Sequence, residues 1–375
     1  MPHTTPQQLR EMVNAALKDD VLEFASDPKY TTTFTSTGIL PFDILWGGGI
    51  PRGRFIEIYG DYSTLKSYVG IMSIASYQRA GMTAAVIDTE HSFDEAWARS
   101  CGVNTADLII QRPATGELAM DTLEALIRGG VDLVVFDSVA AMTPQAEQTK
   151  RLHNESIQPA RIAMLMSAAL RRLTTANTDT SVVWINQMRV NIGITFGSNE
   201  ALPGGKALPY YSSYRTQVRK VGKLTRPRKA YDGEAWVNTK DIIGQKFKAE
   251  LTKSKLSKPF SEQFFTWSLE TGSLDLVGYL IAQGVETGKV SQKGNTWQYA
   301  SVKAVGRENF RKKLEADDDA KLDLENEIRD HYEIPRVQRA TATTRTTSKA
   351  RSTSRGPSRR RNSADSAKKK TLRKR

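Results

Sequence analysis

The chain has 375 residues, of which 39% are hydrophobic and 25% charged, enough to build two or three domains with buried cores. Its one cysteine, Cys101, excludes a disulfide framework and a cysteine-based zinc site, and four scattered histidines disfavour a histidine metal cluster. No apolar run reaches the roughly 18–20 residues of a membrane span, and residues 1–9 lack a secretory signal pattern. These features predict a cytoplasmic protein without a membrane partner.

The net charge of +13 is concentrated at the C-terminus. Residues 336–375 hold fifteen Lys/Arg and one acid, Asp365, a net charge of +14, whereas residues 1–335 hold 39 basic and 40 acidic residues. This Ser/Thr/Arg/Lys-rich tail lacks the large apolar residues that would offset its ordering entropy, so we expect it to be disordered. A solvated cationic arm is typical of proteins that bind nucleic acid, although it could also serve solubility alone.

In chain order, residues 6–18 place apolar side chains at helical spacing and predict a short amphipathic helix before a polar linker. From residue 38 to about 270, continuous apolar strands alternate with helical stretches. We expect strands at 55–59, 84–88, 108–111, 133–137 and 182–186, and helices at 67–80, 93–101, 117–128 and 159–175. This alternation predicts a doubly wound α/β fold around a parallel sheet.

A more β-rich region follows, with strands expected at 217–221 and 247–253. Residues 272–334 predict a small α+β domain, with helices at 274–285 and within 307–332 around a short segment at 297–299. The expected organisation is an N-terminal arm at 1–30, a core domain at 31–271, a small domain at 272–335 and the basic tail at 336–375.

The clearest chemical motif lies where the first strand runs into a helix, in the segment FIEIYGDYSTLKS at 55–67. It matches the phosphate-binding loop G-x-x-x-x-G-K-[ST], except that Leu65 stands where the second glycine belongs. Backbone N–H groups of such a loop bind phosphate oxygens, Lys66 would neutralise phosphate charge, and Ser67 would hold Mg²⁺. A non-glycine residue with positive φ costs on the order of 1 kcal/mol, so Leu65 is expected to remodel the loop somewhat.

Two further strands end in acidic residues that suit the same site. The strand LVVFD ends at Asp137, the Walker-B pattern that steers Mg²⁺ and water. Glu90 follows the strand at 84–88 and could act as a general base, because ligands bind at the carboxyl ends of parallel strands. Asp94 and Trp97 follow Glu90 at four and seven residues, so all three could share one helical face, with Trp97 stacked on a base or packed in the core.

Gln187 comes at the end of the strand at 182–186, where its amide could contact a γ-phosphate and report hydrolysis to the segment that follows. That segment, MRVNIGITFGSNEALPGGK at 188–206, is long, glycine-containing and mixed basic and aromatic. Loops of this length inside a compact domain are usually functional, and this composition favours binding a nucleic-acid strand over a merely disordered loop.

Several blocks, taken together, resemble the RecA recombinase family. They are STGILPFDILWGGGIPRGRFIEIYG, VIDTEHSFDEAWA, VDLVVFDSVAAMTP, INQMRVNIGITFG, GGKALPYYSSYR and KSKLSKPF, in the family's order and spacing. The resemblance covers roughly residues 30–300. It implies a RecA-like P-loop ATPase core with a parallel-rich twisted sheet, an N-terminal helical arm that docks on the next protomer, and a small C-terminal domain that helps to capture duplex DNA.

For the nucleotide site, the resemblance implies ATP and Mg²⁺ as ligands. The residues that match the phosphate loop are Gly60, Asp61, Tyr62, Ser63, Thr64, Leu65, Lys66 and Ser67. Asp137 matches the Walker-B acid, Glu90 the catalytic glutamate, and Gln187 the γ-phosphate sensor. Asp94 and Trp97 match the adenine-contacting positions. Lys253 and Lys255 match a lysine pair that reaches the neighbouring subunit's ATP, and strand alternation independently puts both on one face.

For DNA, the resemblance implies two binding loops, at 147–160 and 188–206. The first lies beside a helix that bears Arg171, and Tyr210 and Arg215 match positions at the subunit interface and near the DNA. The DNA-contacting residues implied in and around these loops are Arg171, Arg189, Phe196, Gly204, Gly205, Lys206 and Arg215.

Three features depart from the bacterial pattern of this family. They are Leu65 in the phosphate loop, a first DNA loop, EQTKRLHNESIQP, that differs from the bacterial consensus, and a basic tail in place of an acidic one. Bulky apolar residues at the position of Leu65 occur in similar phage recombinases, so the departures favour a divergent, phage-borne member that acts at the nucleoid of a host cell.

The expected function is ATP-dependent pairing and strand exchange by a helical homo-oligomeric filament on single-stranded DNA, with double-stranded DNA as the second partner. One alternative is a RecA-fold ring motor or repair accessory ATPase, which would form closed rings. Another is a non-hydrolysing DNA-coating protein, which would lack DNA-stimulated ATPase activity.

Overall fold

The structure is a computed structural model that describes residues 4–148, 159–190, 200–231 and 233–338. The sequence-predicted N-terminal helix is present as α1 (Pro6–Leu17). Thr5 and Gln8 form a capping box at its start, with Pro6 in the first turn. None of its residues is buried, and Leu9, Met12 and Leu17 are among its exposed apolar side chains. The basic tail lies outside the described residues, apart from 336–338.

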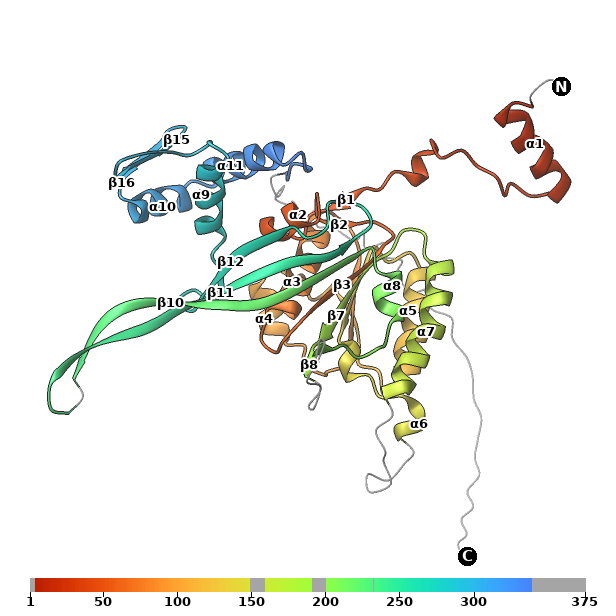
Figure 1. Cartoon of the computed structure of the whole chain (residues 1–375), viewed down its shortest axis with the longest axis horizontal. Coiled ribbons are helices and arrows are strands. Elements are labelled where there is room, and N and C mark those ends of the chain that lie inside the picture. Colours follow the sequence, from red (N-terminus) through yellow and green to blue (C-terminus); the bar gives the residue numbers. More distant parts are fainter. Residues whose placement is uncertain (1–3, 149–158, 191–199, 232, 339–375) are drawn as a thin grey trace, which may run out of the picture. The chain divides into compact units, whose positions relative to one another are not determined.

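A nine-stranded mixed sheet forms the centre of the core domain (Figure 1). Its order is β13-β12-β11-β10-β3-β7-β6-β4-β5. The strands from β10 to β5 run parallel, and those from β13 to β10 pair antiparallel. Besides β10, the parallel strands are β3 (Phe55–Gly60), β4 (Ala84–Asp88), β5 (Ile109–Gln111), β6 (Leu133–Asp137) and β7 (Ser181–Gln187), which confirms the five predicted from the apolar runs.

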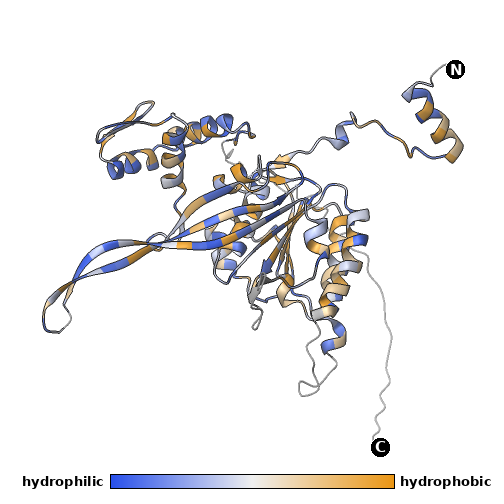
Figure 2. Ribbon diagram, in the orientation of Figure 1, coloured by the Kyte–Doolittle hydropathy of each residue, from blue (hydrophilic) through white to orange (hydrophobic). Residues whose placement is uncertain are grey.

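The four strands β3, β7, β6 and β4 are buried on both faces because helices cover each side of the sheet. Alternate residues supply two hydrophobic clusters: Val135 and Val183 face one, and Val134 and Val182 face the other. The first cluster includes residues of α2 (Leu40–Leu45), α3 (Lys66–Arg79) and α4 (Glu95–Ser100), and the second those of α5 (Gly116–Arg128), α7 (Pro159–Ala176) and α8 (Ala207–Tyr211). Figure 2 shows the apolar character of these central strands.

The antiparallel part of the sheet is larger than the sequence predicts. The strands expected at 217–221 and 247–253 extend into β10 (Tyr214–Tyr231) and β11 (Trp236–Ser254), which pair along their whole length as one long hairpin. β12 (Glu262–Ser268) and β13 (Ser273–Leu274) complete this side. Shorter elements are β1 (Phe34–Thr35), β2 (Ile50–Pro51), α6 (Gln145–Gln148), β8 (Arg189–Val190), β9 (Glu200–Ala201), and single 3₁₀ turns at Pro28–Tyr30 and Val139–Ala141.

The small C-terminal domain is α+β, as expected, and its hydrophobic cluster also includes Leu40 of α2. It contains α9 (Leu276–Glu286), a three-stranded antiparallel sheet of β14 (Ser291–Lys293), β15 (Thr296–Tyr299) and β16 (Val302–Val305), then α10 (Arg307–Glu315) and α11 (Asp318–His331). The charged stretch 307–332 is divided between two helices because Asp317 caps the start of α11 through the Ala320 N–H.

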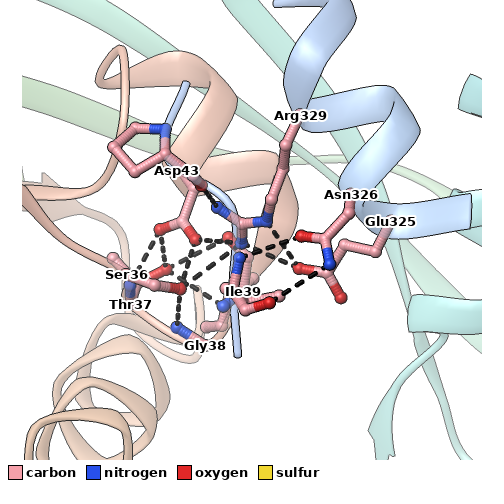
Figure 3. Close-up of polar contacts among 10 residues, drawn as sticks. Ser36, Thr37, Gly38, Ile39, Asp43, Glu325, Asn326 and Arg329 are labelled. Atoms are coloured by element: carbon pink, nitrogen blue, oxygen red, sulfur yellow. Dashed lines mark hydrogen bonds and ion pairs between the residues drawn. The ribbon is translucent and has the colours of Figure 1, made fainter. Parts of the chain in front are cut away.

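A buried polar network joins this small domain to the start of the core domain (Figure 3). Arg329 of α11 contacts Asp43 of α2 and Glu325 of its own helix. Asp43 also accepts hydrogen bonds from Ser36 Oγ and from the N–H and hydroxyl of Thr37. Because the network fixes both the turn before α2 and the last turns of α11, it sets how the two elements pack.

Candidate active site

The phosphate-loop segment forms the expected strand–turn–helix between β3 and α3. Gly60 is needed there because a Cβ at this position would lie 2.2 Å from the carbonyl oxygen of Val218 on β10. Leu65 adopts a left-handed conformation, with φ 64° and ψ 17°, immediately before the helix. Its side chain packs against the core cluster beside α3, and this packing offsets the strain of the left-handed residue.

Lys66 is held inside the loop. Its Nζ donates to the carbonyl oxygens of Gly60 (3.2 Å) and Asp61 (2.6 Å) and to the hydroxyl of Thr64 (3.2 Å). Burial is the main cause that lowers its pKa, while the carboxylates of Asp137 and Glu90 act in the opposite direction. A buried ammonium whose hydrogen bonds go to backbone carbonyls is poised to exchange them for phosphate oxygens, which carry full charge.

Asp137 ends β6 and accepts a hydrogen bond from Ser67, the first-turn residue of α3. Burial raises its pKa to about 6, and the charges of Glu90 and Asp88 act in the same direction. The carboxylate and hydroxyl therefore converge, as the sequence predicts for a Mg²⁺ site. No group of three or more His, Cys, Asp or Glu that could hold a metal occurs among the described residues. Mg²⁺ bound through one or two side chains and phosphates fits this sparse set.

Glu90 lies beside this pair, in the loop after β4. Its Oε1 accepts hydrogen bonds from Ser138 Oγ and from Gln187 Nε2, both at 2.5 Å. The ends of β6 and β7 thus each bring one side chain to a carboxylate oxygen of the residue that follows β4. The sequence predicts roles for Glu90 and Gln187, but it gives Ser138 none. The only sequence signal for Ser138 is its place directly after the Walker-B acid.

The loop that carries Glu90 is organised by Asp88, which accepts hydrogen bonds from the N–H groups of Ser92 (3.0 Å) and Phe93 (3.1 Å). Arg112, just after β5, pairs with Asp88 at 3.1 Å and donates to the Phe93 carbonyl. Neither residue was identified from sequence. Asp88 is a strand residue by pattern, and nothing in the sequence links it to Arg112, 24 positions away.

The expectation that Glu90, Asp94 and Trp97 share one helical face is wrong. α4 begins only at Glu95, because Asp94 acts as its N-cap and accepts the Trp97 N–H at 2.7 Å. Glu90 therefore belongs to a loop. Trp97 is 38% exposed, with its ring 6.2 Å from that of Tyr68, so it is not an ordinary core residue and leaves a face for a stacked base.

A cavity of 410 Å³ connects these groups. Its lining residues are Tyr62, Ser63, Thr64, Leu65, Lys66, Ser67, Tyr68, Glu90, Trp97, Asp137, Ile185, Gln187 and Trp267. Asp94 and Trp97 line a smaller neighbouring cavity that also reaches Ser67 and Asp137. Trp267 of β12 was not predicted, and its ring meets Tyr68 edge-on at 5.0 Å. The donor set fits a nucleoside triphosphate with Mg²⁺: a cation and loop N–H groups for phosphates, a hydroxyl and carboxylate for the metal, and indole faces for a base.

Lys253 and Lys255 lie together elsewhere, next to Tyr210, and neither lines this cavity. Lys253 Nζ donates to the carbonyl oxygens of Pro209 (2.6 Å) and Tyr210 (2.9 Å). Lys255 Nζ lies 6.0 Å from the centre of the Tyr210 ring. Burial lowers the pKa of Lys253 to about 8, and the charges of Lys255 and Arg215 act in the same direction. The two ammonium groups therefore form one cationic cluster separate from the cavity of their own chain.

The residues expected to contact DNA fall into three groups. Phe196, residues 149–158 of the first DNA loop and residues 191–199 of the second lie outside the described residues, and of Arg189 only the backbone, in β8, is described. Arg171 on α7 and Lys206 before α8 are exposed. Arg215 is instead committed to the buried carboxylate of Glu57 at 2.6 Å.

Gly204 and Gly205 have a packing role as well. Both have positive φ, and a Cβ at Gly205 would lie 2.8 Å from that of Ala163 on α7. The preceding residue, Pro203, accepts a hydrogen bond from Asn186, the neighbour of Gln187. The end of the 188–206 segment is therefore anchored to the same strand end that contacts Glu90.

Comparison with known proteins identifies the family. A model of the RecA N-terminal domain matches residues 6–272. The protein named RecA from Clostridium perfringens is 38% identical over 305 residues, which cover 80% of this chain and 82% of the relative. RecA of Bordetella petrii is 38% identical over 304 residues (80% and 81%), and RecA of an Azoarcus species is 40% identical over 299 residues (78% and 83%). No helix in the described ranges is long and apolar enough to cross a membrane. With this extent of similarity and the site described above, the chain belongs to the RecA family.

Proposed function

We propose that this protein is an ATP-dependent DNA recombinase, which forms helical filaments on single-stranded DNA and exchanges strands with a duplex. The observation that carries the proposal is the hydrogen bond from Gln187 to Glu90. Gln187 immediately precedes the 188–206 segment, so one side chain links the candidate catalytic carboxylate to the candidate DNA-binding loop. A change at the γ-phosphate would then alter the conformation of that segment.

Each residue of the cavity has a task in this function. Lys66 and the loop N–H groups bind phosphate oxygens, and Ser67 and Asp137 hold the metal. When bound, Mg²⁺ supplies positive charge that stabilises the phosphate oxygens during transfer. Glu90 takes a proton from the attacking water, for which it must be released from Ser138 and Gln187. Trp97 and Asp94 orient the base.

The cationic cluster of Lys253 and Lys255 completes the site from a neighbouring protomer. Its separation from the cavity of its own chain supports this role, since a lysine pair with no phosphate partner in its own subunit can act across an interface. Arg171, Lys206 and the 188–206 segment with Arg189 and Phe196 bind the single strand through its backbone and bases, largely without sequence preference. The small domain at 272–335 and the basic tail serve duplex DNA.

The test is ATP hydrolysis and strand exchange by the full chain with and without single-stranded DNA. We expect single-stranded DNA to stimulate hydrolysis, and Lys66→Ala to abolish ATP binding because the phosphates lose their buried cation. Gln187→Ala should retain ATP binding but lose most of the stimulation by DNA. Stimulation equal to that of the parent protein in Gln187→Ala would contradict the proposed coupling.

The shared site has its own test, in which filaments are mixed from two inactive proteins. Lys253→Ala and Glu90→Gln subunits should each hydrolyse ATP poorly. Their mixture should recover activity, because some interfaces then combine the intact Glu90 of one subunit with the intact Lys253 of its neighbour. No recovery, with co-assembly verified, would count strongly against a site shared between protomers. Closed rings in electron micrographs would favour a ring motor, and ATP binding without any hydrolysis would favour a DNA-coating protein.

A further inference from the structure

The hairpin of β10 and β11 continues past the sheet that anchors it (Figure 1). β10 pairs with β3 only as far as Val218, and β11 pairs with β12 only from Gly244 onward. In residues 219–243 each strand therefore has only the other as a neighbour, and we call this segment the distal ribbon. It contains seven Lys/Arg and three Asp/Glu, and six of the basic residues fall within 219–229 of β10, which has no acid.

The two faces of the distal ribbon differ. Residues directly opposite each other in an antiparallel pair share a face. The register therefore shows on which face each side chain in the outer part of the ribbon lies. One face, which we call the lysine face, carries the pairs Thr225–Ile242, Pro227–Lys240, Lys229–Asn238 and Tyr231–Trp236. The other, the arginine face, carries Arg226–Asp241, Arg228–Thr239 and Ala230–Val237.

Acidic side chains already neutralise the arginine face. Arg226 pairs with Glu270 at 2.8 Å, and Arg228 pairs with Asp241 at 3.3 Å. These are exposed ion pairs, which contribute little to stability, but they leave little free positive charge on that side.

The lysine face has the opposite character. Lys229 and Lys240 are exposed, and neither forms an ion pair with any residue that the structure describes. Beyond them, at the tip, Tyr231 is 59% and Trp236 71% exposed, with ring centres 5.8 Å apart in an edge arrangement. Two free cations and two exposed aromatic rings therefore share one side of the distal ribbon, together with the exposed Ile242.

Exposed aromatic groups of this size mark interaction surfaces, and the adjacent free cations indicate a polyanionic partner. The major groove of B-DNA admits a two-stranded β-ribbon. Lys229 and Lys240 are diagonal neighbours, roughly 7–8 Å apart at the backbone, so both can contact phosphates of one stretch of DNA. The tip aromatics then meet the groove, where apolar side chains contact base edges and steps.

We propose that the lysine face of the distal ribbon binds duplex DNA, with Lys229 and Lys240 on phosphates and Tyr231 and Trp236 in the groove. This inference rests on the function proposed above and names a contact surface for the second DNA partner. A charged edge can also simply protect an exposed ribbon from aggregation, and an aromatic tip can dock on a second copy of the chain, so the test separates these outcomes.

The experiment measures duplex affinity of the full chain at several salt concentrations for two double variants. Lys229→Ala/Lys240→Ala removes two charges from the lysine face, and Arg226→Ala/Arg228→Ala removes the same charge from the arginine face as a matched control. We expect the lysine-face variant to lose affinity several-fold and to flatten the slope of log K against log salt by about 1.8, for two phosphate contacts. The arginine-face variant should change both quantities much less. Trp236→Ala should weaken duplex binding without changing the salt slope.

Single-strand-stimulated ATP hydrolysis, measured on the same proteins, keeps this test independent of the proposed function. It should be unchanged in all variants, because none of these residues lines the cavity. Equal losses of duplex affinity in both double variants would overturn a face-specific site, and unchanged affinity with more aggregation would assign the lysines to solubility. A loss of self-association in Trp236→Ala with unchanged duplex affinity would assign the tip to a second copy. Absent ATPase activity in the parent protein would instead refute the proposed function.

Discussion

Arg329 Nη2 lies 2.6 Å from Asp43 Oδ2, although the two residues are 286 positions apart, in α11 and α2. Both side chains are almost fully buried, Arg329 at 1% exposed and Asp43 at 0%. The carboxylates of Asp43 and Glu325 raise the pKa of Arg329, in spite of its burial, and keep it charged. This ion pair thus joins the small C-terminal domain to the start of the core domain, beside the apolar contacts that Leu40 of α2 makes with the small domain (Figure 3).

Replacing Arg329 with Met should lower the free energy of unfolding by about 3–5 kcal/mol, because the buried Asp43 carboxylate keeps its hydrogen bonds from Ser36 and Thr37 but loses its counter-charge. Adding Asp43→Asn should recover part of this loss, since the uncompensated charge is removed. Urea unfolding of the two single variants and the double variant measures the coupling. Arg336→Met, which breaks the exposed pair with Asp330, is the control and should change stability little. Additive losses would mean that the pair is not coupled.

Glu90→Gln should retain ATP binding and lower the rate of hydrolysis by about 10²-fold or more, as expected for loss of a general base. The DNA-bound filament should live longer, because release follows hydrolysis. Ser138→Ala removes one hydrogen bond to Glu90 and should have a smaller effect on the rate. ATP turnover and filament lifetime on single-stranded DNA give both quantities. Hydrolysis by Glu90→Gln at the rate of the parent protein would refute its assignment as the base.

Arg112→Gln should lower kcat for ATP while changing KM much less, because Arg112 acts through Asp88 on the loop that positions Glu90. Arg112→Lys, which keeps the charge, should restore part of the rate. Arg99→Gln is a suitable control, since Arg99 makes an exposed pair with Glu95 on the nearby helix α4. A parallel rise in KM, or no rescue by lysine, would argue against a positioning role.

Lys253 should lose its proton near pH 8 in the free protomer. Between pH 8 and the unfolded-state pKa of about 10.4, the unfolded chain binds more protons at this residue, so its contribution to folding stability rises with pH over that window. Contact with a neighbour's phosphate should raise the pKa, because the charged amine is then favoured.

Competitive acylation followed by mass spectrometry, with and without filament assembly, measures this titration. Lys255→Ala, which removes a nearby like charge, should also raise the pKa of Lys253. A titration midpoint near 10 in the free protomer would show that burial does not perturb this lysine.

Deletion of residues 336–375 should weaken duplex affinity and flatten its salt dependence, because the segment carries a net charge of +14. The ATPase activity at saturating single-stranded DNA should remain, since no catalytic residue lies in that segment. Titration of full-length and truncated protein on duplex DNA at two salt concentrations makes the comparison. Equal affinities and equal slopes, with only more aggregation after truncation, would leave the tail a solubility role.

The phosphate loop, the Walker-B strand and the parallel α/β core could be predicted from the sequence because each depends on neighbours in the chain. The loop at 60–67 is one strand–turn–helix, and the apolar runs of the parallel strands are needed wherever both faces of a sheet are covered. Trp97 and Asp94 line the cavities beside the phosphate loop, but their helix begins later than predicted, because Asp94 caps it.

Only the tertiary structure decided which side chains meet. Ser138, Gln187 and Glu90 converge because β6, β7 and β4 end at the same edge of the sheet. Local sequence patterns do not predict the order of strands in a sheet. The pairs Arg112–Asp88 and Arg329–Asp43 also depend on the tertiary structure, since no local sequence pattern identifies the distant acid with which an arginine pairs. The full length of the β10–β11 hairpin was not predicted either, because exposed strands that pair only with each other lack the regular apolar alternation that burial against a core imposes.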